Sequence, residues 1–176
     1  MIKRRGFGVL WSANSLSNLA DGLAFISMPL LAASMTDDPR LVAGLASMYA
    51  LIRLLVALPI GVWVDRLDRR SLMVGANLIR GGALLALAVT IQLDVAGLTA
   101  LYAVMAVVGT LESLADNAAV AILPSLVKKE ELDSANSRIT GVQLVADEFV
   151  GPPLGGFLFG LAAALPVFAM GGLWAG

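Results

Sequence analysis

The chain has 176 residues, of which 59% are hydrophobic and 14% are charged, and its mean hydropathy is +0.86. A soluble domain carries about 25% charged residues, so we expect this chain to lie in a lipid bilayer. It contains no Cys and no His, which excludes disulfides, thiol and imidazole catalysis and most zinc sites. The net charge is −1 and the basic residues are scattered between apolar runs, so we expect no nucleic-acid partner.

Five apolar segments are long enough to cross a bilayer, which takes about 20 residues in a helix. They cover residues 7–35, 41–64, 71–93, 97–126 and 134–166. Pro, Gly or charged residues separate them, as expected where helices stop. The sequence therefore predicts an all-α membrane protein in which residues 1–176 form one bundle of transmembrane helices.

The tail from residue 167, VFAMGGLWAG, has about half the length needed for a further crossing. It looks like the start of a sixth helix, so we expect the chain to be a fragment. A cleavable signal peptide is a less favoured interpretation of the N-terminus. The apolar stretch after Lys3 is too long for one, and it contains Asn14, Asn18 and Asp21.

The basic residues alternate between the two ends of the predicted helices. Nine lie at the N-terminus and around the second and fourth breaks: Lys3, Arg4, Arg5, Arg66, Arg69, Arg70, Lys128, Lys129 and Arg138. The first and third breaks together hold only Arg40. Because basic residues favour the cytoplasmic side, we expect a multi-pass protein with a cytoplasmic N-terminus.

The second break carries the pattern GVWVDRLDRR over residues 61–70. It resembles motif A of the major facilitator superfamily, which reads Gly-x-x-x-Asp-Arg/Lys-x-Gly-Arg-Arg/Lys. The matching residues are Gly61, Asp65, Arg66, Arg69 and Arg70. Asp68 replaces the second Gly of the pattern, and Asp tolerates turn geometry well.

Two further stretches resemble the same family. LPSLVKKEELDSAN (123–136) looks like the connector before the fifth helix of bacterial macrolide-efflux and siderophore exporters, and VGPPLGG (150–156) resembles motif C of the antiporter branch. The resemblance implies a twelve-helix exporter in the bacterial cytoplasmic membrane, of which this chain holds five helices and the start of the sixth. The proton gradient would supply the energy, with no cofactor, metal site or catalytic residue.

Motif A also has a physical interpretation. Gly61 lets a neighbouring helix approach closely, and Asp65 can face a helix N-terminus. The arginines can bind carboxylates; alternatively, they only enforce the topology. The resemblance implies a charge relay between motif A and an acid near the cytoplasmic end of the fourth helix. Asp116 fits this role, because it precedes Pro124 by eight residues, or about 12 Å along a helix.

Seven charged residues fall inside the predicted crossings: Asp21, Arg53, Arg80, Glu112, Asp116, Asp147 and Glu148. Each costs about 2.5–3.5 kcal/mol near the bilayer centre, so each needs a reason. At a rise of about 1.5 Å per residue, Asp21, Glu112 and Asp147 lie roughly 20 Å from the cytoplasmic helix ends. Arg53 lies at a similar level. We therefore expect a central polar cavity that handles the proton and the substrate.

Helical spacing places several polar residues on common faces. Asn14, Asn18 and Asp21 form a polar stripe on the first helix, which we assign to the cavity with Arg53 and Arg80. Glu112 and Asp116 share a face of the fourth helix. The first and fourth helices should therefore line the cavity.

The intramembrane charges have two possible explanations. One is burial as ion pairs, such as Arg53 with Asp21 or Arg80 with Asp116. The other is proton binding, and it follows from their number. The crossings hold five acids but only two arginines, so at least three carboxyls have no arginine to pair with. A desolvated, unpaired carboxyl tends to hold a proton, and permanent access of water is the alternative.

The fifth segment is rich in glycine and proline. These residues include Gly151, Pro152, Pro153, Gly155 and Gly156. Proline removes helical hydrogen bonds and kinks a helix, whereas glycine permits close packing. The pattern predicts either a bend that seals the cavity during exchange or a packing interface of small residues.

We therefore expect a proton-coupled secondary transporter that exports a small molecule, such as a drug, a macrolide-like compound or a siderophore, by alternating access. Its expected partners are the bilayer, the substrate and a C-terminal half. The candidates for proton handling are Asp21, Glu112 and Asp147, and those for a cytoplasmic gate are Asp65, Arg69 and Asp116. An importer is the nearest alternative, followed by a non-transporting truncated or scaffold protein. No recognisable nucleophile or metal cluster points to an enzyme.

Overall fold

The structure is a computed structural model that describes residues 2–175, apart from the side chains of residues 2–5, 58, 62, 63 and 65. In chain order it contains α1 (Ile2–Met35), α2 (Pro39–Arg66), α3 (Arg69–Gln92), α4 (Leu98–Leu126), the 3-10 helix η1 (Lys129–Glu131), α5 (Leu132–Leu144), the π-helix η2 (Val145–Val150), α6 (Gly151–Leu161) and α7 (Leu165–Ala175). No strand occurs within residues 2–175. The predicted all-α fold class is confirmed.

Five helical stretches are long and apolar enough to cross a membrane: Gly6–Met35, Pro39–Ala57, Arg69–Gln92, Leu98–Leu126 and the continuous run Lys129–Leu161. Their first residues follow from the local sequence. Pro39 begins α2, at a position where a helix needs no N–H donor. Asp68 caps α3 by accepting a hydrogen bond from the Ser71 N–H at 2.8 Å. Gly97 precedes α4 in extended backbone.

The fifth predicted crossing ends earlier than the sequence pattern indicated. The helix stops at Leu161, and α7 begins at Leu165 after a short turn. Pro166 lies in the first turn of α7, where its missing N–H costs little. The prediction of a single segment over 134–166 is therefore wrong at its C-terminal end. The break at residues 162–164 consists of alanines, which carry no stop signal.

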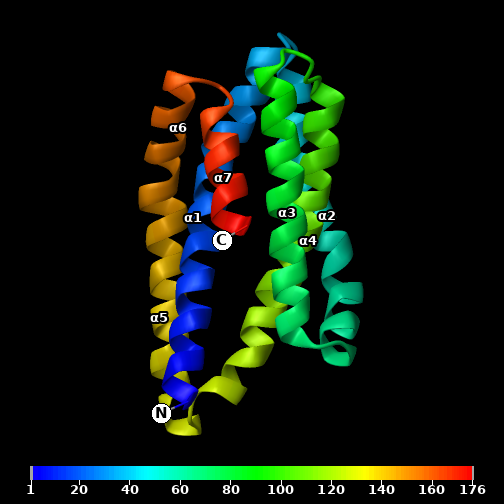
Figure 1. Cartoon of the computed structure of the whole chain (residues 1–176). Helices are drawn as coiled ribbons and strands as arrows, with labels where there is room; N and C mark the ends of the chain where they lie inside the picture. The colour runs from blue at the N-terminus through cyan, green and yellow to red at the C-terminus, as the bar shows by residue number, and fades with distance from the viewer. Residues whose placement is uncertain (1, 176) are drawn as a thin grey trace.

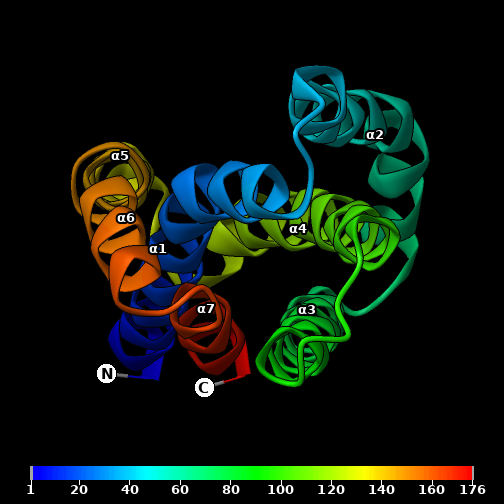
Figure 2. The ribbon, with the colours of Figure 1, turned by 90° about the horizontal axis from the view of Figure 1, so that it is seen from above.

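Helices α1 and α4 form the centre of the bundle (Figures 1 and 2). Helix α1 packs against α6, α7 and η2, whereas α4 packs against α2 and α3. Helices α3 and α7 also pack together. The largest hydrophobic core joins α1, α2, α3, α4 and α7 and includes Leu23, Leu31, Leu45, Leu84, Leu101 and Met170.

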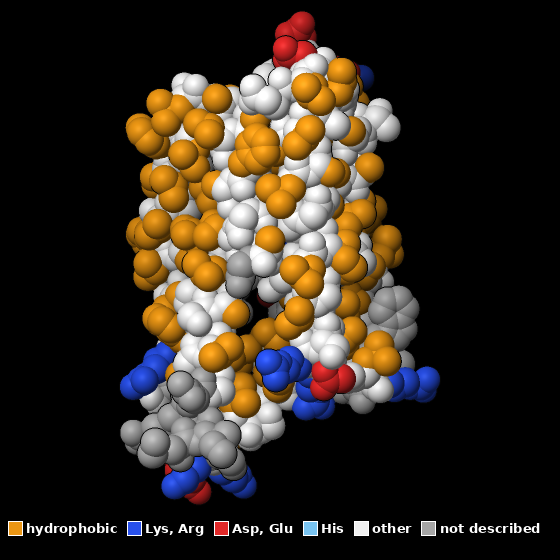
Figure 3. Space-filling view, in the orientation of Figure 1, with side chains coloured by type: hydrophobic (Ala, Val, Ile, Leu, Met, Phe, Trp, Pro, Cys, Tyr) orange, Lys and Arg blue, Asp and Glu red, His pale blue; other side chains and the backbone are white. Residues whose placement is uncertain are grey.

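The surface divides by side-chain type along the bundle axis. Figure 3 shows hydrophobic side chains over most of the visible flank and Lys and Arg side chains gathered near its lower end. In Figure 1 the α2–α3 turn and the α4–α5 connection lie at that same end. Acidic side chains stand out at the opposite end. The bundle therefore presents an apolar belt with a basic end.

Candidate functional site

A cavity of about 500 Å³ lies between α1, α2, α4 and η2. Its apolar lining includes Phe25, Met28, Pro29, Leu45, Ala46 and Met105. Its charged lining consists of Asp21, Arg53, Glu112, Asp147 and Glu148. The structure thus brings together five of the seven charged residues that the sequence places inside the crossings, from four helical elements.

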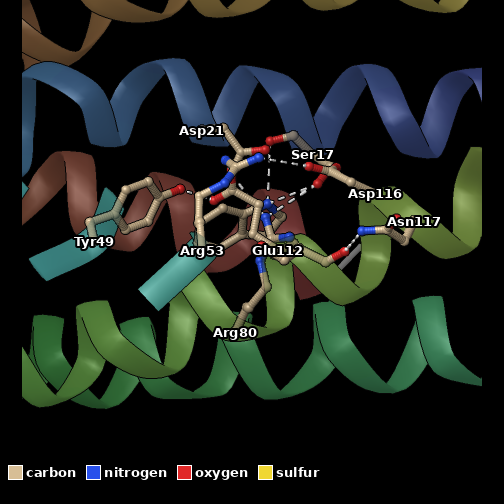
Figure 4. Close-up of polar contacts among 10 residues, drawn as sticks. Ser17, Asp21, Tyr49, Arg53, Arg80, Glu112, Asp116 and Asn117 are labelled. Carbon is tan, nitrogen blue, oxygen red and sulfur yellow. Dashed lines mark hydrogen bonds and ion pairs between the residues drawn. The ribbon is translucent and has the colours of Figure 1, made fainter. Parts of the chain in front are cut away.

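Tyr49, Arg53, Glu112 and Asp116 form the Arg53 cluster between α2 and α4 (Figure 4). The Tyr49 hydroxyl and Arg53 Nη1 each donate to one oxygen of the Glu112 carboxylate. Arg53 Nη2 lies 3.5 Å from Asp116 Oδ2. The Glu112 side chain is 6% exposed but that of Arg53 is 41% exposed, so water reaches the arginine.

Ser17, Asp21, Arg80 and Trp174 form the Arg80 cluster between α1, α3 and α7. Arg80 Nη2 donates to Asp21 Oδ1 at 2.9 Å and to Ser17 Oγ at 3.3 Å. The Trp174 ring centre lies 3.9 Å from the guanidinium carbon. The Arg80 side chain is 0% exposed and that of Asp21 is 13% exposed, so this cluster closes around its arginine.

The ion pairs differ from those that the sequence suggested. Pairing of Arg53 with Asp21 and of Arg80 with Asp116 is wrong, since Arg53 binds the α4 acids and Arg80 binds Asp21. The physical reason is lateral packing. Helix α2 lies against α4, whereas α3 packs on both α4 and α7 and its Arg80 side chain reaches Asp21 of α1. Depth along a helix axis does not determine which neighbour a side chain meets.

Three residues that the sequence assigned to the cavity do not line it: Asn14, Asn18 and Arg80. Arg80 is enclosed behind α1. Asn18 is buried, and its Nδ2 donates to the Asn14 carbonyl of the same helix at 2.7 Å. Asn18 therefore donates within α1 and not into the cavity, and the prediction that Asn14, Asn18 and Arg80 line the cavity does not hold.

The glycine- and proline-rich segment begins directly after the π-helix η2. Pro152 and Pro153 lack the N–H groups that an α-helix would donate one turn back. The Gly151 N–H donates to the Ala146 carbonyl, five residues earlier, which is the π-helical pattern. The two prolines therefore lie in the first turn of α6 instead of interrupting an α-helix.

Asp147 and Glu148 lie on η2 and reach the cavity from its side. Neither forms an ion pair with a described Lys or Arg. Asp147 Oδ1 is buried and has no hydrogen-bond partner in the part of the chain that the structure describes. These two acids differ in this respect from Asp21 and Glu112, which each bind an arginine.

Glycines permit η2 and α6 to pack directly on α1. A Cβ atom at Gly151 would lie 2.5 Å from Gly22 Cα, and one at Gly155 would lie 2.8 Å from Ser27 Oγ. A Cβ at Gly156 would meet its nearest neighbour only at 3.8 Å. Gly151 and Gly155 therefore form a close contact with α1, whereas the packing at position 156 does not require a glycine.

The motif A turn differs in two respects from its physical interpretation. A Cβ at Gly61 would meet no described heavy atom within 4 Å, so no helix of the described bundle packs closely at this position. The substitution of Asp68 for glycine supplies the N-cap of α3, in extended backbone at φ −66°. Hydrogen bonds from Ser71 lower the pKa of Asp68 below its ordinary value. The side chain of Asp65 lies outside the described residues.

Arg69 connects the motif A turn to α4. Its Nη1 donates to the Ala121 carbonyl at 2.6 Å. Pro124 lies three residues further along α4 and has no N–H to donate to the carbonyl of residue 120. Asp116, the relay acid implied by the family resemblance, instead lies within 3.5 Å of Arg53. Arg66 and Arg70 are exposed.

Sequence reasoning missed Tyr49, Ser17, Trp174 and the tightly packed Gly22. Tyr49 precedes Arg53 by four residues and Ser17 precedes Asp21 by four, so helical spacing could have found both. Trp174 and Gly109 carry no such signal. A Cβ atom at position 109 would lie 3.0 Å from the Tyr49 ring, so glycine leaves room for that ring. The roles of Trp174 and Gly109 depend on which helices become neighbours.

Comparison with known families supports the same interpretation. The model of the Major Facilitator Superfamily matches residues 10–176. No curated protein matches the chain. The matched residues include all the residues that line the cavity and all members of both arginine clusters. This chain is an all-α membrane bundle that belongs to the major facilitator superfamily of secondary transporters.

Proposed function

We propose that the chain forms the N-terminal bundle of a proton-coupled exporter of small molecules. The observation that supports this proposal is the composition of the cavity, where four acids and one arginine line the same space as a continuous apolar wall. Acids supply sites for a proton or a cationic group, and the apolar wall supplies contact area for an organic molecule. A second bundle would close the cavity and alternate its access.

Asp147 is the acid that we propose for the coupled proton. Among the three candidates, Asp21 binds Arg80 and Glu112 binds Arg53 and Tyr49. Asp147 has no described ion-pair partner, and one of its oxygens is buried without a hydrogen bond. A proton binding at this oxygen would replace no existing contact, and its release needs only access of water to the cavity.

The proposed substrate class is a macrolide-like compound or a siderophore, by resemblance of the 123–136 connector to exporters of these molecules. Erythromycin is a suitable first probe, because it carries one basic amine on a sugar attached to a large macrolactone ring. The amine could bind the acidic lining and the ring could contact Phe25, Met28 and Met105. A catecholate siderophore is the second probe.

Transport into everted membrane vesicles tests the proposal. We expect an acid-inside pH gradient to drive uphill erythromycin or siderophore uptake by the full-length protein, and nigericin to abolish it. Asp147→Asn should abolish gradient-driven uptake while leaving membrane insertion unchanged. Accumulation only in right-side-out vesicles would indicate an importer. No gradient-dependent flux of either probe would contradict the proposed exporter and favour a non-transporting role.

The cytoplasmic orientation of the basic end is part of the same proposal. The chain has no cysteine, so single cysteines can be introduced at three exposed positions: Asp37, Leu67 and Val95. An impermeant thiol reagent should label the variants at 37 and 95 from outside a bacterial cell and should not label the variant at 67. The opposite pattern would overturn the orientation.

A further inference from the structure

Arg80 is the most completely buried charged side chain in the described part of the molecule, with 0% exposure. It extends from the middle of α3 to α1, where a single atom, Nη2, contacts both Asp21 and Ser17. Its Nε and Nη1 atoms are buried without hydrogen-bond partners among the described residues. A buried cation is stable only when neighbouring groups offset its charge, so the Nη2 contacts with Asp21 and Ser17 must hold Arg80 in place.

Trp174 supplies the second part of that compensation. Its ring lies over the guanidinium at 3.9 Å, a cation–π contact that is strengthened by exclusion of water. The indole Nε1 donates to Ser17 Oγ at 3.1 Å and to the Ser17 carbonyl at 3.3 Å. Ser17 therefore contacts both Arg80 and Trp174, and the three residues join α1, α3 and α7.

Asp21 connects this enclosed group to the cavity. It is 13% exposed and lines the cavity, whereas Arg80 and Trp174 do not. Figure 4 shows Arg80 and Asp21 meeting beside the Arg53 cluster. The carboxylate is thus bound from behind by a cation that substrate and bulk water cannot reach directly. Its position in the cavity wall depends on Arg80 and, through Arg80, on α7.

We propose that Arg80 is a positioning residue, which holds the Asp21 carboxylate at the cavity wall and links its position to α7 through Trp174. This inference rests on the proposed function for its effect on substrate, but the link itself is a property of the fold. Occupancy or neutralisation of Asp21 should change the environment of Trp174. Displacement of α7 should in turn move the Asp21 carboxylate.

Trp174 fluorescence tests the link without any transport. These 176 residues hold three tryptophans, so Trp11→Phe with Trp63→Phe, together with Phe at any tryptophan outside them, leaves Trp174 as the single emitter. In the purified full-length protein we expect Asp21→Asn to shift Trp174 emission to the red and increase its quenching by acrylamide. Asp21→Glu, which keeps the charge within reach of Arg80, should retain the original emission.

Glu148→Gln is the matched control, because it neutralises an acid of the same cavity that makes no described contact with the Arg80 cluster. It should leave Trp174 emission unchanged. Identical emission from the Asp21→Asn and parent proteins would overturn the proposal, and so would an equal shift from Glu148→Gln. If Asp21→Asn does not fold, Asp21→Ser, which removes the same charge with a smaller side chain, provides the same test.

Transport separates a positioning role from a structural one. Arg80→Lys keeps the positive charge but loses the planar guanidinium group and its stacking on the Trp174 ring. We expect KM for gradient-driven erythromycin uptake to rise about tenfold, with kcat and melting temperature changed far less. An unchanged KM would overturn the positioning role. Absence of uptake in the parent protein would refute the proposed function, and the fluorescence result would still decide the link.

Discussion

The Arg53 and Arg80 clusters use the same chemistry in different surroundings. Both place an arginine from an adjacent helix against acids of a central helix. Arg53 is 41% exposed and lines the cavity, whereas Arg80 is 0% exposed and is covered by Trp174. Water can therefore replace a lost contact of Arg53 but not of Arg80. An arginine within a membrane bundle is a candidate for substrate handling only if the cavity reaches it.

The largest expected effect tests this difference directly. Asp21→Asn leaves Arg80, whose side chain is 0% exposed, without its ion-pair partner and should destabilise the protein by about 3–5 kcal/mol. Glu112→Gln should cost only about 1 kcal/mol, because Arg53 is 41% exposed and still lies 3.5 Å from Asp116. Unfolding of both variants in detergent measures the difference.

A double variant serves as the control for this first prediction. Combining Arg80→Gln with Asp21→Asn removes both charges and should restore most of the lost stability and membrane yield. Equal losses from Asp21→Asn and Glu112→Gln, or no recovery in the double variant, would break the distinction between an enclosed and an open cluster.

The second prediction concerns the packing that holds α1 between the two clusters. Gly151→Ala places a Cβ 2.5 Å from Gly22 Cα, so backbone must shift at a cost of about 1–3 kcal/mol. Gly160→Ala is the matched control on the same helix, because a Cβ there meets nothing within 4 Å. Thermal unfolding should show a lower Tm for the first variant alone; equal Tm values would exclude a tight contact.

The third prediction sharpens the description of the Arg53 cluster. Tyr49→Phe removes the hydroxyl that donates to Glu112 but keeps the ring against Gly109. Because Arg53 still binds the same carboxylate, we expect a loss of about 1 kcal/mol. Unfolding measurements in detergent test this. A loss as large as that of Asp21→Asn would show that the Arg53 cluster is also closed to water.

The smallest effect comes from an ion that is fully exposed. The pKa of Asp68 is lowered by hydrogen bonds from Ser71, so its cap stabilises the fold above the ordinary Asp value of 3.8. This stability is lost as the pH falls through the lower, folded-state pKa. The stability difference between the parent protein and Asp68→Ala should therefore be present at neutral pH and shrink below about pH 4. A difference that grows in acid would contradict the cap.

Much of the fold can be predicted from the sequence because it depends on local patterns of residues. Apolar length determined the crossings, and helical periodicity determined which acids share a face, as with Glu112 and Asp116. A constant rise per residue also places Asp21, Glu112 and Asp147 at similar depth, and all three line one cavity. The break at residues 162–164 escaped prediction, since alanine favours a helix as readily as it permits a turn.

Only the tertiary structure decided which charges meet. Periodicity defines the depth and the face of a side chain on its own helix, but neighbours depend on how helices pack in the plane of the membrane. Arg80 therefore binds Asp21 instead of Asp116, and Trp174 covers it from a segment whose sequence carries no such signal. In the same way, Gly61 and Gly151 look alike in the sequence, yet among the described residues Gly151 lies against another helix and Gly61 does not. Contacts between distant segments arise from the combined packing of all the helices, which no local pattern specifies.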